Sequence, residues 1–132
     1  MVQGKILVID DDEGMTELLS MLLSPESSQI ITANSGKKGI KLAKEQTPDI
    51  IILDLMMPEM NGWSVCQQIR KFSDAPILIL SAMDAPQMVT DALDAGADDY
   101  LVKPVSSSTL LAKVNQLTRR AKANHTSDPL NP

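Results

Sequence analysis

The chain has 132 residues and a formal net charge of −5, and 43% of its residues are hydrophobic while only 2% are aromatic. This length suits one domain, and the acidic balance argues against nucleic-acid binding by this segment, because neutralising phosphates requires a basic face. A single cysteine, Cys66, excludes an internal disulfide, and no apolar run is long enough to span a membrane, so we expect a soluble protein in a reducing, cytoplasmic setting.

Short apolar runs alternate with longer segments of helical periodicity. The predicted strands cover residues 5–10, 29–33, 49–54, 76–80 and 99–103, and the predicted helices cover residues 13–24, 36–46, 62–72, 85–95 and 106–121. Strands as apolar as Ile50 to Leu53 are typical of a sheet that is covered on both faces. Five strand–helix units therefore predict an α/β fold, a doubly wound parallel sheet with five helices.

Residues that favour helix ends stand at these boundaries. Ser35, Asn61, Asp84 and Ser106 are candidate N-caps, and Gly96 is placed to end the fourth helix. These local signals agree with the periodicity.

The end of the chain is polar, contains proline and lacks periodicity. We therefore predict a folded domain over residues 1–121 and a linker or disordered tail over residues 122–132. His125 is the only histidine and lies in this tail, so catalysis or metal binding centred on histidine has no plausible location.

Acidic residues end the first and third predicted strands. Asp10 and Asp11 follow the first apolar run, and Asp54 follows the third. In a doubly wound sheet of order 2-1-3-4-5, the ligand site lies beyond the carboxyl ends of strands one and three, where the strand order reverses. Three neighbouring carboxylates repel one another, and all-oxygen ligands favour Mg²⁺ or Mn²⁺.

The fourth and fifth predicted strands deliver two further polar groups to the same edge. Ser81 follows the fourth strand and offers a hydroxyl, while Lys103 follows the fifth and offers an ammonium. A carboxylate can accept a phosphoryl group as an acyl phosphate, and a cation with a lysine can neutralise the phosphoryl oxygens. The pattern indicates a phosphoryl site in which Asp54 is the nucleophile.

Four motifs carry a resemblance to a known family. They are residues 5–12 (KILVIDDD), 51–62 (IILDLMMPEMNG), 78–82 (LILSA) and 96–104 (GADDYLVKP). With these motifs in order, residues 4–120 resemble the CheY-like receiver domain of two-component response regulators. The resemblance implies a flavodoxin-like fold and a regulatory domain that is not an enzyme beyond weak self-catalysed phosphorylation and dephosphorylation.

The resemblance also implies roles for the acidic residues. Asp54 would be phosphorylated by a sensor histidine kinase or a histidine phosphotransfer protein. Mg²⁺ would bind through Asp11, Asp54 and the Met56 main-chain carbonyl, and Asp10 would help through water.

Further expectations concern the switch and the partners. The resemblance implies that Ser81 and Lys103 hold the phosphoryl group and that Tyr100 repacks when it arrives. The surface formed by the fourth helix, fifth strand and fifth helix would then shift, and a phosphorylation-dependent homodimer could form through it. An output domain could follow residue 132. The resemblance places kinase docking at Gly14, Met15, Leu18, Pro104 and Val105.

Other interpretations remain open. Asp12 is a third acid where the family needs two, so we expect it to be a helix cap or a solvated charge. The chain departs from the commonest family pattern with Val105 after Lys103-Pro104, and with Asp91 and Thr109 on the dimer face. A nucleotide-binding module would need a glycine-rich phosphate loop, which is absent after the first strand. The stronger alternative is a receiver-like interaction module that is never phosphorylated.

Overall fold

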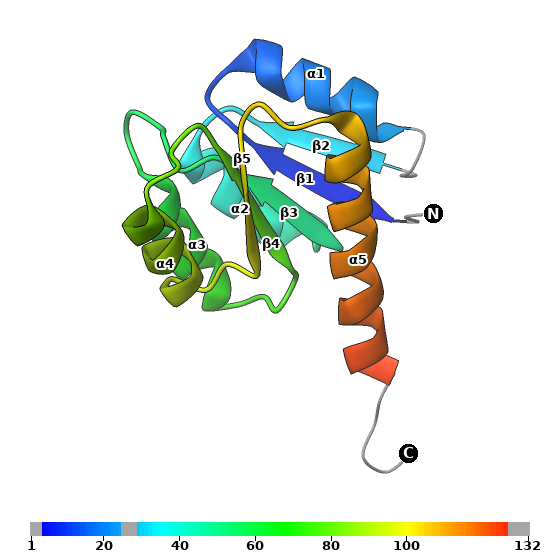
Figure 1. The fold of residues 1–132 in the computed structure, drawn as a ribbon. Helices are drawn as coiled ribbons and strands as arrows, with labels where there is room; N and C mark the ends of the chain where they lie inside the picture. The colour runs from blue at the N-terminus through cyan, green and yellow to red at the C-terminus, as the bar shows by residue number, and fades with distance from the viewer. Residues whose placement is uncertain (1–3, 25–28, 127–132) are drawn as a thin grey trace.

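The computed structural model describes residues 4–24 and 29–126, and strands and helices alternate along them (Figure 1). The elements are β1 (Lys5–Ile9), α1 (Glu13–Leu23), β2 (Gln29–Ala33), α2 (Gly36–Gln46), β3 (Ile50–Leu53), α3 (Gly62–Arg70), β4 (Ile77–Ser81), α4 (Pro86–Asp94), β5 (Asp99–Val102) and α5 (Ser107–Thr126). All strand pairs are parallel, in the order β2-β1-β3-β4-β5. The predicted flavodoxin-like, doubly wound sheet with this strand order is confirmed.

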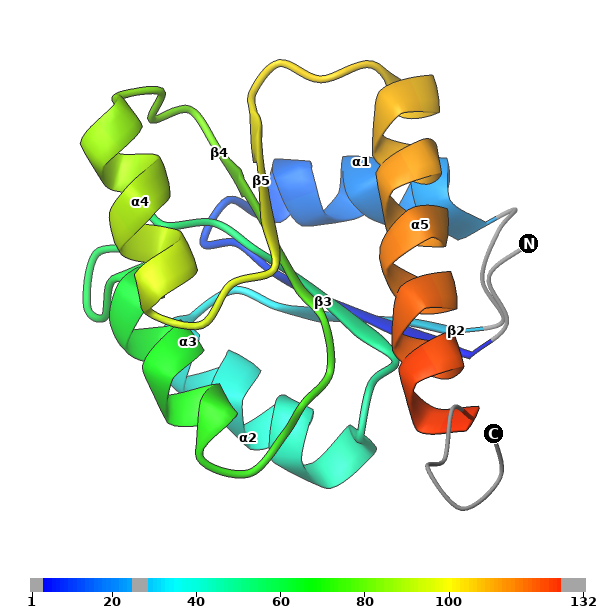
Figure 2. The ribbon, with the colours of Figure 1, turned by 60° about the horizontal axis from the view of Figure 1, so that its bottom comes forward.

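Helices cover both faces of the sheet. Helices α1 and α5 lie on one face, and α2, α3 and α4 lie on the other (Figures 1 and 2). Because strand side chains alternate, Leu7 and Ile9 pack with α2 to α4, whereas Ile6 and Val8 pack with α1 and α5. Each fully buried side chain of this size contributes about 1.5–3 kcal/mol, so the central strands form a rigid platform for the loops at their ends.

Most of the predicted helix ends are confirmed. The side chains of Ser35 and Asn61 accept hydrogen bonds from main-chain N–H groups in the first turns of α2 and α3, and Ser106 does the same for Thr109. The prediction that Asp84 is the N-cap of α4 is wrong. The N-cap is Ala85, which makes no side-chain hydrogen bond. Proline at the start of α4 presets the helical φ, and this substitutes for a polar cap.

The last helix is longer than expected. We predicted that it ends at residue 121, but α5 continues to Thr126, so the first part of the predicted tail is helical. Alanine and lysine residues in this segment have good helix propensity, which favours continuation of the helix. The prediction ended the helix too early because it relied on the polarity of the segment. Residues 127–132 lie outside the described part of the chain. None of the helices within residues 4–24 and 29–126 combines the length and apolarity that a bilayer crossing requires.

A polar network ties together the amino-terminal edge of the sheet. The Arg70 guanidinium, at the end of α3, donates to the main-chain oxygens of Gly96 (2.9 Å), Ser73 (3.1 Å) and Ala75 (2.7 Å). It also pairs with Asp98 at 2.8 Å, and the same Asp98 oxygen accepts from the main-chain N–H of Ile77. The network joins α3, the start of β4 and the α4–β5 connection.

Cys66 is buried in the core on α3. Burial raises the pKa of its thiol to about 11, and the nearby Arg70 opposes that shift. The thiol is therefore protonated at neutral pH, which suits a packing role.

Candidate functional site

The predicted acidic residues meet at the carboxyl-terminal edge of the sheet. Strands β1 and β3 are neighbours, and the main-chain N–H of Asp54 donates to the Ile9 oxygen at 3.0 Å, which holds Asp54 beside the end of β1. Carboxylate oxygens of Asp10, Asp11 and Asp54 lie within 4.8 Å of one another. Asp10 and Asp54 are buried, whereas Asp11 is exposed. The predicted convergence of these three residues is present.

Lys103 reaches the same group from the end of β5. Its Nζ lies 2.9 Å from Asp10 Oδ2 and 3.5 Å from Asp54 Oδ2. Burial lowers the pKa of Lys103, but the hydrogen bond and charge of Asp10, followed by those of Asp54, outweigh burial and leave this pKa raised. Lys103 is therefore a fixed positive charge between two carboxylates.

Ser81 and Tyr100 both contact the loop that follows β4. Ser81 is fully buried, and its hydroxyl oxygen accepts from the main-chain N–H of Met83 at 3.3 Å. The Tyr100 hydroxyl donates to the Met83 oxygen at 2.6 Å. Burial raises the pKa of Tyr100, a hydrogen bond to Ser81 opposes the shift, and the charge of Asp54 adds to it. Tyr100 is thus connected to the loop beside the acidic residues without being one of their contacts.

The β3–α3 loop folds tightly around Asp54. The Met56 main-chain N–H donates to Asp54 Oδ1 at 3.2 Å, and the Gly62 N–H donates to the Leu55 oxygen at 3.0 Å. A Cβ atom on Gly62 would lie 2.7 Å from the Asp54 main-chain oxygen and 2.6 Å from the Leu55 Cα, so only glycine permits this approach. The motif glycine therefore keeps Met56 next to the candidate nucleophile.

The charges of the group do not balance. When ionised, the three carboxylates and the single ammonium of Lys103 leave the cluster with a net charge of −2. Two like charges about 4 Å apart repel by roughly 4 kcal/mol near a protein surface, so an added cation relieves a substantial cost. The donors are all oxygen, which is the ligand set of Mg²⁺ or Mn²⁺.

Asp12 belongs to the helix and not to this cluster. Its side chain is the N-cap of α1, where Oδ1 accepts from Gly14 N (2.9 Å) and Met15 N (3.3 Å). The prediction that Asp12 is a cap is confirmed. Asn34, which was not predicted as a site residue, donates from its side chain to the Asp10 main-chain oxygen at 2.8 Å. A polar residue directly after β2 was the available signal.

The predicted docking residues lie on α1 and on the loop after β5. Leu18 is 48% exposed, Gly14 and Pro104 are exposed, and Met15 and Val105 are partly buried against the α1–α5 side of the core. Met21, which was not predicted, is 73% exposed one turn beyond Leu18. The structure shows an accessible surface here.

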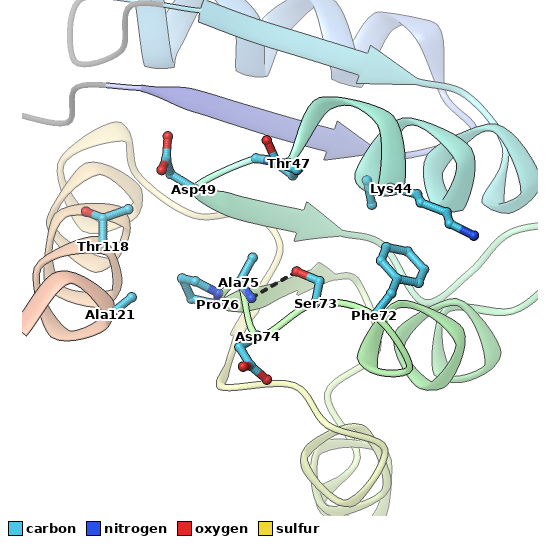
Figure 3. A pocket seen from close by; sticks show the side chains of 12 residues that line it. Lys44, Thr47, Asp49, Phe72, Ser73, Asp74, Ala75, Pro76, Thr118 and Ala121 are labelled. Atoms are coloured by element: carbon cyan, nitrogen blue, oxygen red, sulfur yellow. Dashed lines mark hydrogen bonds between the residues drawn. The ribbon is translucent and has the colours of Figure 1, made fainter. Parts of the chain in front are cut away.

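A cavity of about 390 Å³ opens at the opposite edge of the sheet (Figure 3). It lies among the end of α2, the α3–β4 loop and α5, with the Lys44 ammonium 5.9 Å from the Phe72 ring centre at one side. Asp49 and Asp74 project in different directions from its walls (Figure 3). Its side chains do not converge on one point, so the acidic cluster is the better candidate for chemistry despite the size of this cavity.

Comparison with known families gives one matching description. Residues 6–115 match the family model of the response regulator receiver domain. The match spans all the residues of the acidic cluster together with Ser81 and Lys103.

Two curated relatives and one solved structure illustrate the similarity. The chain is 41% identical over 117 residues to the probable transcriptional regulator ycf27 of Guillardia theta, covering 88% of this chain and 46% of the relative. It is 39% identical over 121 residues to the transcriptional regulatory protein AfsQ1 of Streptomyces coelicolor, covering 92% and 54%. A two-component response regulator from Clostridium difficile superposes with a TM-score of 0.85 at 31% identity, covering 89% and 97%. The chain spans about half the length of the curated relatives.

Proposed function

Because the chain belongs to the response regulator receiver domain family, we propose that Asp54 accepts a phosphoryl group from a phosphohistidine and thereby switches an output. One observation carries this proposal: Asp54 lies within 4.8 Å of two further carboxylates and 3.5 Å from the Lys103 ammonium. The role is regulatory, and any catalysis is limited to weak self-phosphorylation and self-dephosphorylation.

The proposed reaction transfers one phosphoryl group to Asp54. A carboxylate oxygen attacks phosphorus, the new P–O bond forms as the P–N bond of the phosphohistidine breaks, and the leaving imidazole takes up a proton. Lys103 is placed to pair with a phosphoryl oxygen, since it already contacts Asp54. Ser81, on the neighbouring strand, would donate its hydroxyl hydrogen to another.

A divalent cation fits the oxygen donors of the site. Asp11, Asp54 and the Met56 main-chain oxygen would hold Mg²⁺, or Mn²⁺ in its place, and Asp10 would help through water. When bound, the ion would neutralise charge on the phosphoryl oxygens. Asp10 would also position Lys103, because its contact with the ammonium keeps Lys103 beside the nucleophile Asp54.

The switch would act through the loop after β4. In this structure the Ser81 hydroxyl accepts from the Met83 N–H, and the Tyr100 hydroxyl donates to the Met83 oxygen. The main chain of Met83 is therefore hydrogen-bonded by both side chains. A Ser81 hydroxyl turned toward a phosphoryl oxygen would change the first of these contacts and favour repacking of Tyr100. Phosphorylation would then shift the population toward states with a different α4–β5–α5 surface.

The output is proposed from the relatives. Two of them are named as transcriptional regulators, and the chain covers about half of each, so we propose that this domain controls a further domain that acts on transcription. A homodimer through α4, β5 and α5 is a second proposal. Asp98 and Asp99 already pair within the chain with Arg70 and Lys113, so an intermolecular pairing would have to share or replace these contacts.

We propose that a sensor histidine kinase or histidine phosphotransfer protein docks on α1 and the loop after β5. The exposed Leu18 and the adjacent Met15 and Val105 offer an apolar surface beside the acidic cluster. Leu18→Asp should slow transfer from the phosphohistidine partner at least tenfold while labelling by acetyl phosphate stays unchanged. Leu93→Asp on α4, at a similarly exposed leucine, is the matched control. Equal transfer rates for wild type and Leu18→Asp would reject this docking surface.

Beryllofluoride binding tests whether the domain is a phosphoacceptor, because this ion mimics a phosphoryl group on a carboxylate. ¹⁹F NMR of the wild type should show bound fluoride that depends on Mg²⁺, and the Asp54→Asn variant should show none. No binding by the folded wild type would favour the alternative, an interaction module that is never phosphorylated. Binding by both proteins would assign the site to another residue.

A further inference from the structure

The two acids at the end of β1 are held in different ways. The Asp10 carboxylate accepts from the Asp12 N–H at 3.0 Å through one oxygen and pairs with Lys103 at 2.9 Å through the other. The Asp11 carboxylate is exposed and has no hydrogen-bond partner within residues 4–24 and 29–121. The position of Asp11 therefore depends on its main chain.

Little else packs against Asp11. A cavity of about 320 Å³ extends beside it, between residues 34–36 on one side and residues 57–60 on the other. Because open space adjoins this carboxylate, no side-chain packing on that flank can fix it. The direction of the Asp10–Asp11 peptide is the remaining restraint.

Asn34 supplies that restraint. It directly follows β2, whose last residue, Ala33, accepts from the Asp10 N–H at 3.1 Å. Its side-chain Nδ2 donates to the Asp10 oxygen at 2.8 Å. The Asp10 carbonyl and the Asp11 N–H belong to one planar peptide unit, so fixing the carbonyl direction also fixes the backbone leading into Asp11.

The same amide anchors the far side of the turn. Asn34 Nδ2 lies 3.2 Å from the Thr16 hydroxyl oxygen, and this buried hydroxyl in turn donates to the Glu13 oxygen at 3.0 Å. One amide nitrogen, with two hydrogens to donate, thus joins the end of β1 to the first turn of α1. The turn that presents Asp11 is held at both of its ends.

We infer that Asn34 is a positioning residue for the divalent cation: it fixes the Asp10–Asp11 peptide so that the Asp11 carboxylate faces Asp54. The inference rests on the proposed function, because it assigns Asp11 to cation binding. Outer partners that orient metal ligands commonly contribute 10–100-fold to metal affinity, which sets the size of the expected effect.

The test compares Asn34→Ala with Ser35→Ala. Ser35 is the neighbouring residue, and its hydroxyl accepts from the Lys38 N–H to cap α2. Within the described residues it makes no hydrogen bond to the β1–α1 turn, so its loss is a matched structural control. Mn²⁺ affinity, measured from the free-ion signal in electron paramagnetic resonance, should weaken about 10-fold in Asn34→Ala and stay near wild type in Ser35→Ala. Labelling by acetyl phosphate should require about 10-fold more Mg²⁺ in Asn34→Ala than in the wild type, whereas Ser35→Ala should follow the wild-type Mg²⁺ dependence.

A second readout uses the metal-free protein. The ¹⁵N order parameter of the Asp11 amide should fall in Asn34→Ala and not in Ser35→Ala. Asn34→Ser, which keeps one donor, should lie between Asn34→Ala and wild type in both measurements, and it also serves if the alanine variant does not fold.

Wild-type Mn²⁺ affinity and an unchanged Asp11 order parameter in Asn34→Ala would overturn the inference. If the wild type binds no Mn²⁺, the proposed cation site fails, and the role of Asn34 toward the cation fails with it. The two failures are distinguishable, because only the second appears in the wild type.

Discussion

The two edges of the sheet differ in how their charged side chains are paired. At the amino-terminal edge, Arg70 forms an ion pair with a single carboxylate, that of Asp98. Its other N–H groups donate hydrogen bonds to main-chain oxygens. At the carboxyl-terminal edge, three carboxylates converge, and among the described residues Lys103, which contacts two of them, is the one cation that pairs with the group. A balanced group stabilises a fold, whereas an unbalanced one keeps ligand capacity at a cost in stability. Uncompensated negative charge therefore distinguishes the candidate site from the opposite edge.

Substitution of Asp54, at the carboxyl-terminal edge, should change function most strongly. Asp54→Asn should reduce labelling by acetyl phosphate with Mg²⁺ by at least about 100-fold, because the amide is a poor nucleophile and cannot form a stable acyl phosphate. Its free energy of unfolding should equal or exceed that of the wild type, since one of three repelling charges is removed. Urea unfolding and radiolabel incorporation measure the two quantities.

Asp12→Asn is the matched control for Asp54→Asn. It changes a neighbouring acid whose side chain caps α1, and asparagine is an equally good cap, so both labelling and stability should stay near wild type. Wild-type labelling of Asp54→Asn would reject Asp54 as the acceptor.

At the amino-terminal edge, where Arg70 is paired, substitution should change stability and leave labelling unchanged. Arg70→Met should lower the free energy of unfolding by about 2–3 kcal/mol, because it leaves the oxygens of Gly96, Ser73 and Ala75 without their donor. Labelling of the folded variant should be unchanged. The control is Arg119→Met, which removes an exposed side chain with one main-chain contact and should shift stability by less than about 0.5 kcal/mol. Similar stability of both variants would show that the Arg70 network contributes little.

A smaller change in the free energy of unfolding is expected at high pH, where Cys66 ionises. The pKa of Cys66 is raised from 9.0 to about 11 in the folded protein, so its contribution is fully present below pH 9 and is lost as pH rises from 9 through 11. Between pH 8 and pH 11, the wild type should therefore lose about 2 kcal/mol more stability than Cys66→Ala. Lys103 and Tyr100 titrate alike in both proteins and cancel in the difference. Parallel pH profiles would contradict the assigned shift.

Much of this molecule could be predicted from its sequence because the strong signals are local or periodic. Apolar runs and helical periodicity located the strands and helices of the described residues. Acidic residues at strand ends, together with the known strand order of such sheets, located the cluster. The end of α5 was missed because a polar helix beyond the core has no periodic marker. The role of Asn34 was missed because it depends on a contact with Asp10 that is 24 residues away.

Mapping the phosphorylated residue is the sharpest test of whether Asp54 is the phosphoacceptor. The wild type would be treated with acetyl phosphate and Mg²⁺, any acyl phosphate would be reduced with borohydride, which converts a phosphorylated aspartate to homoserine, and the peptides would be sequenced by mass spectrometry. We expect homoserine at position 54 alone, and only when Mg²⁺ is present. Homoserine at position 10, 11 or 12, or none at all in the folded protein, would contradict it.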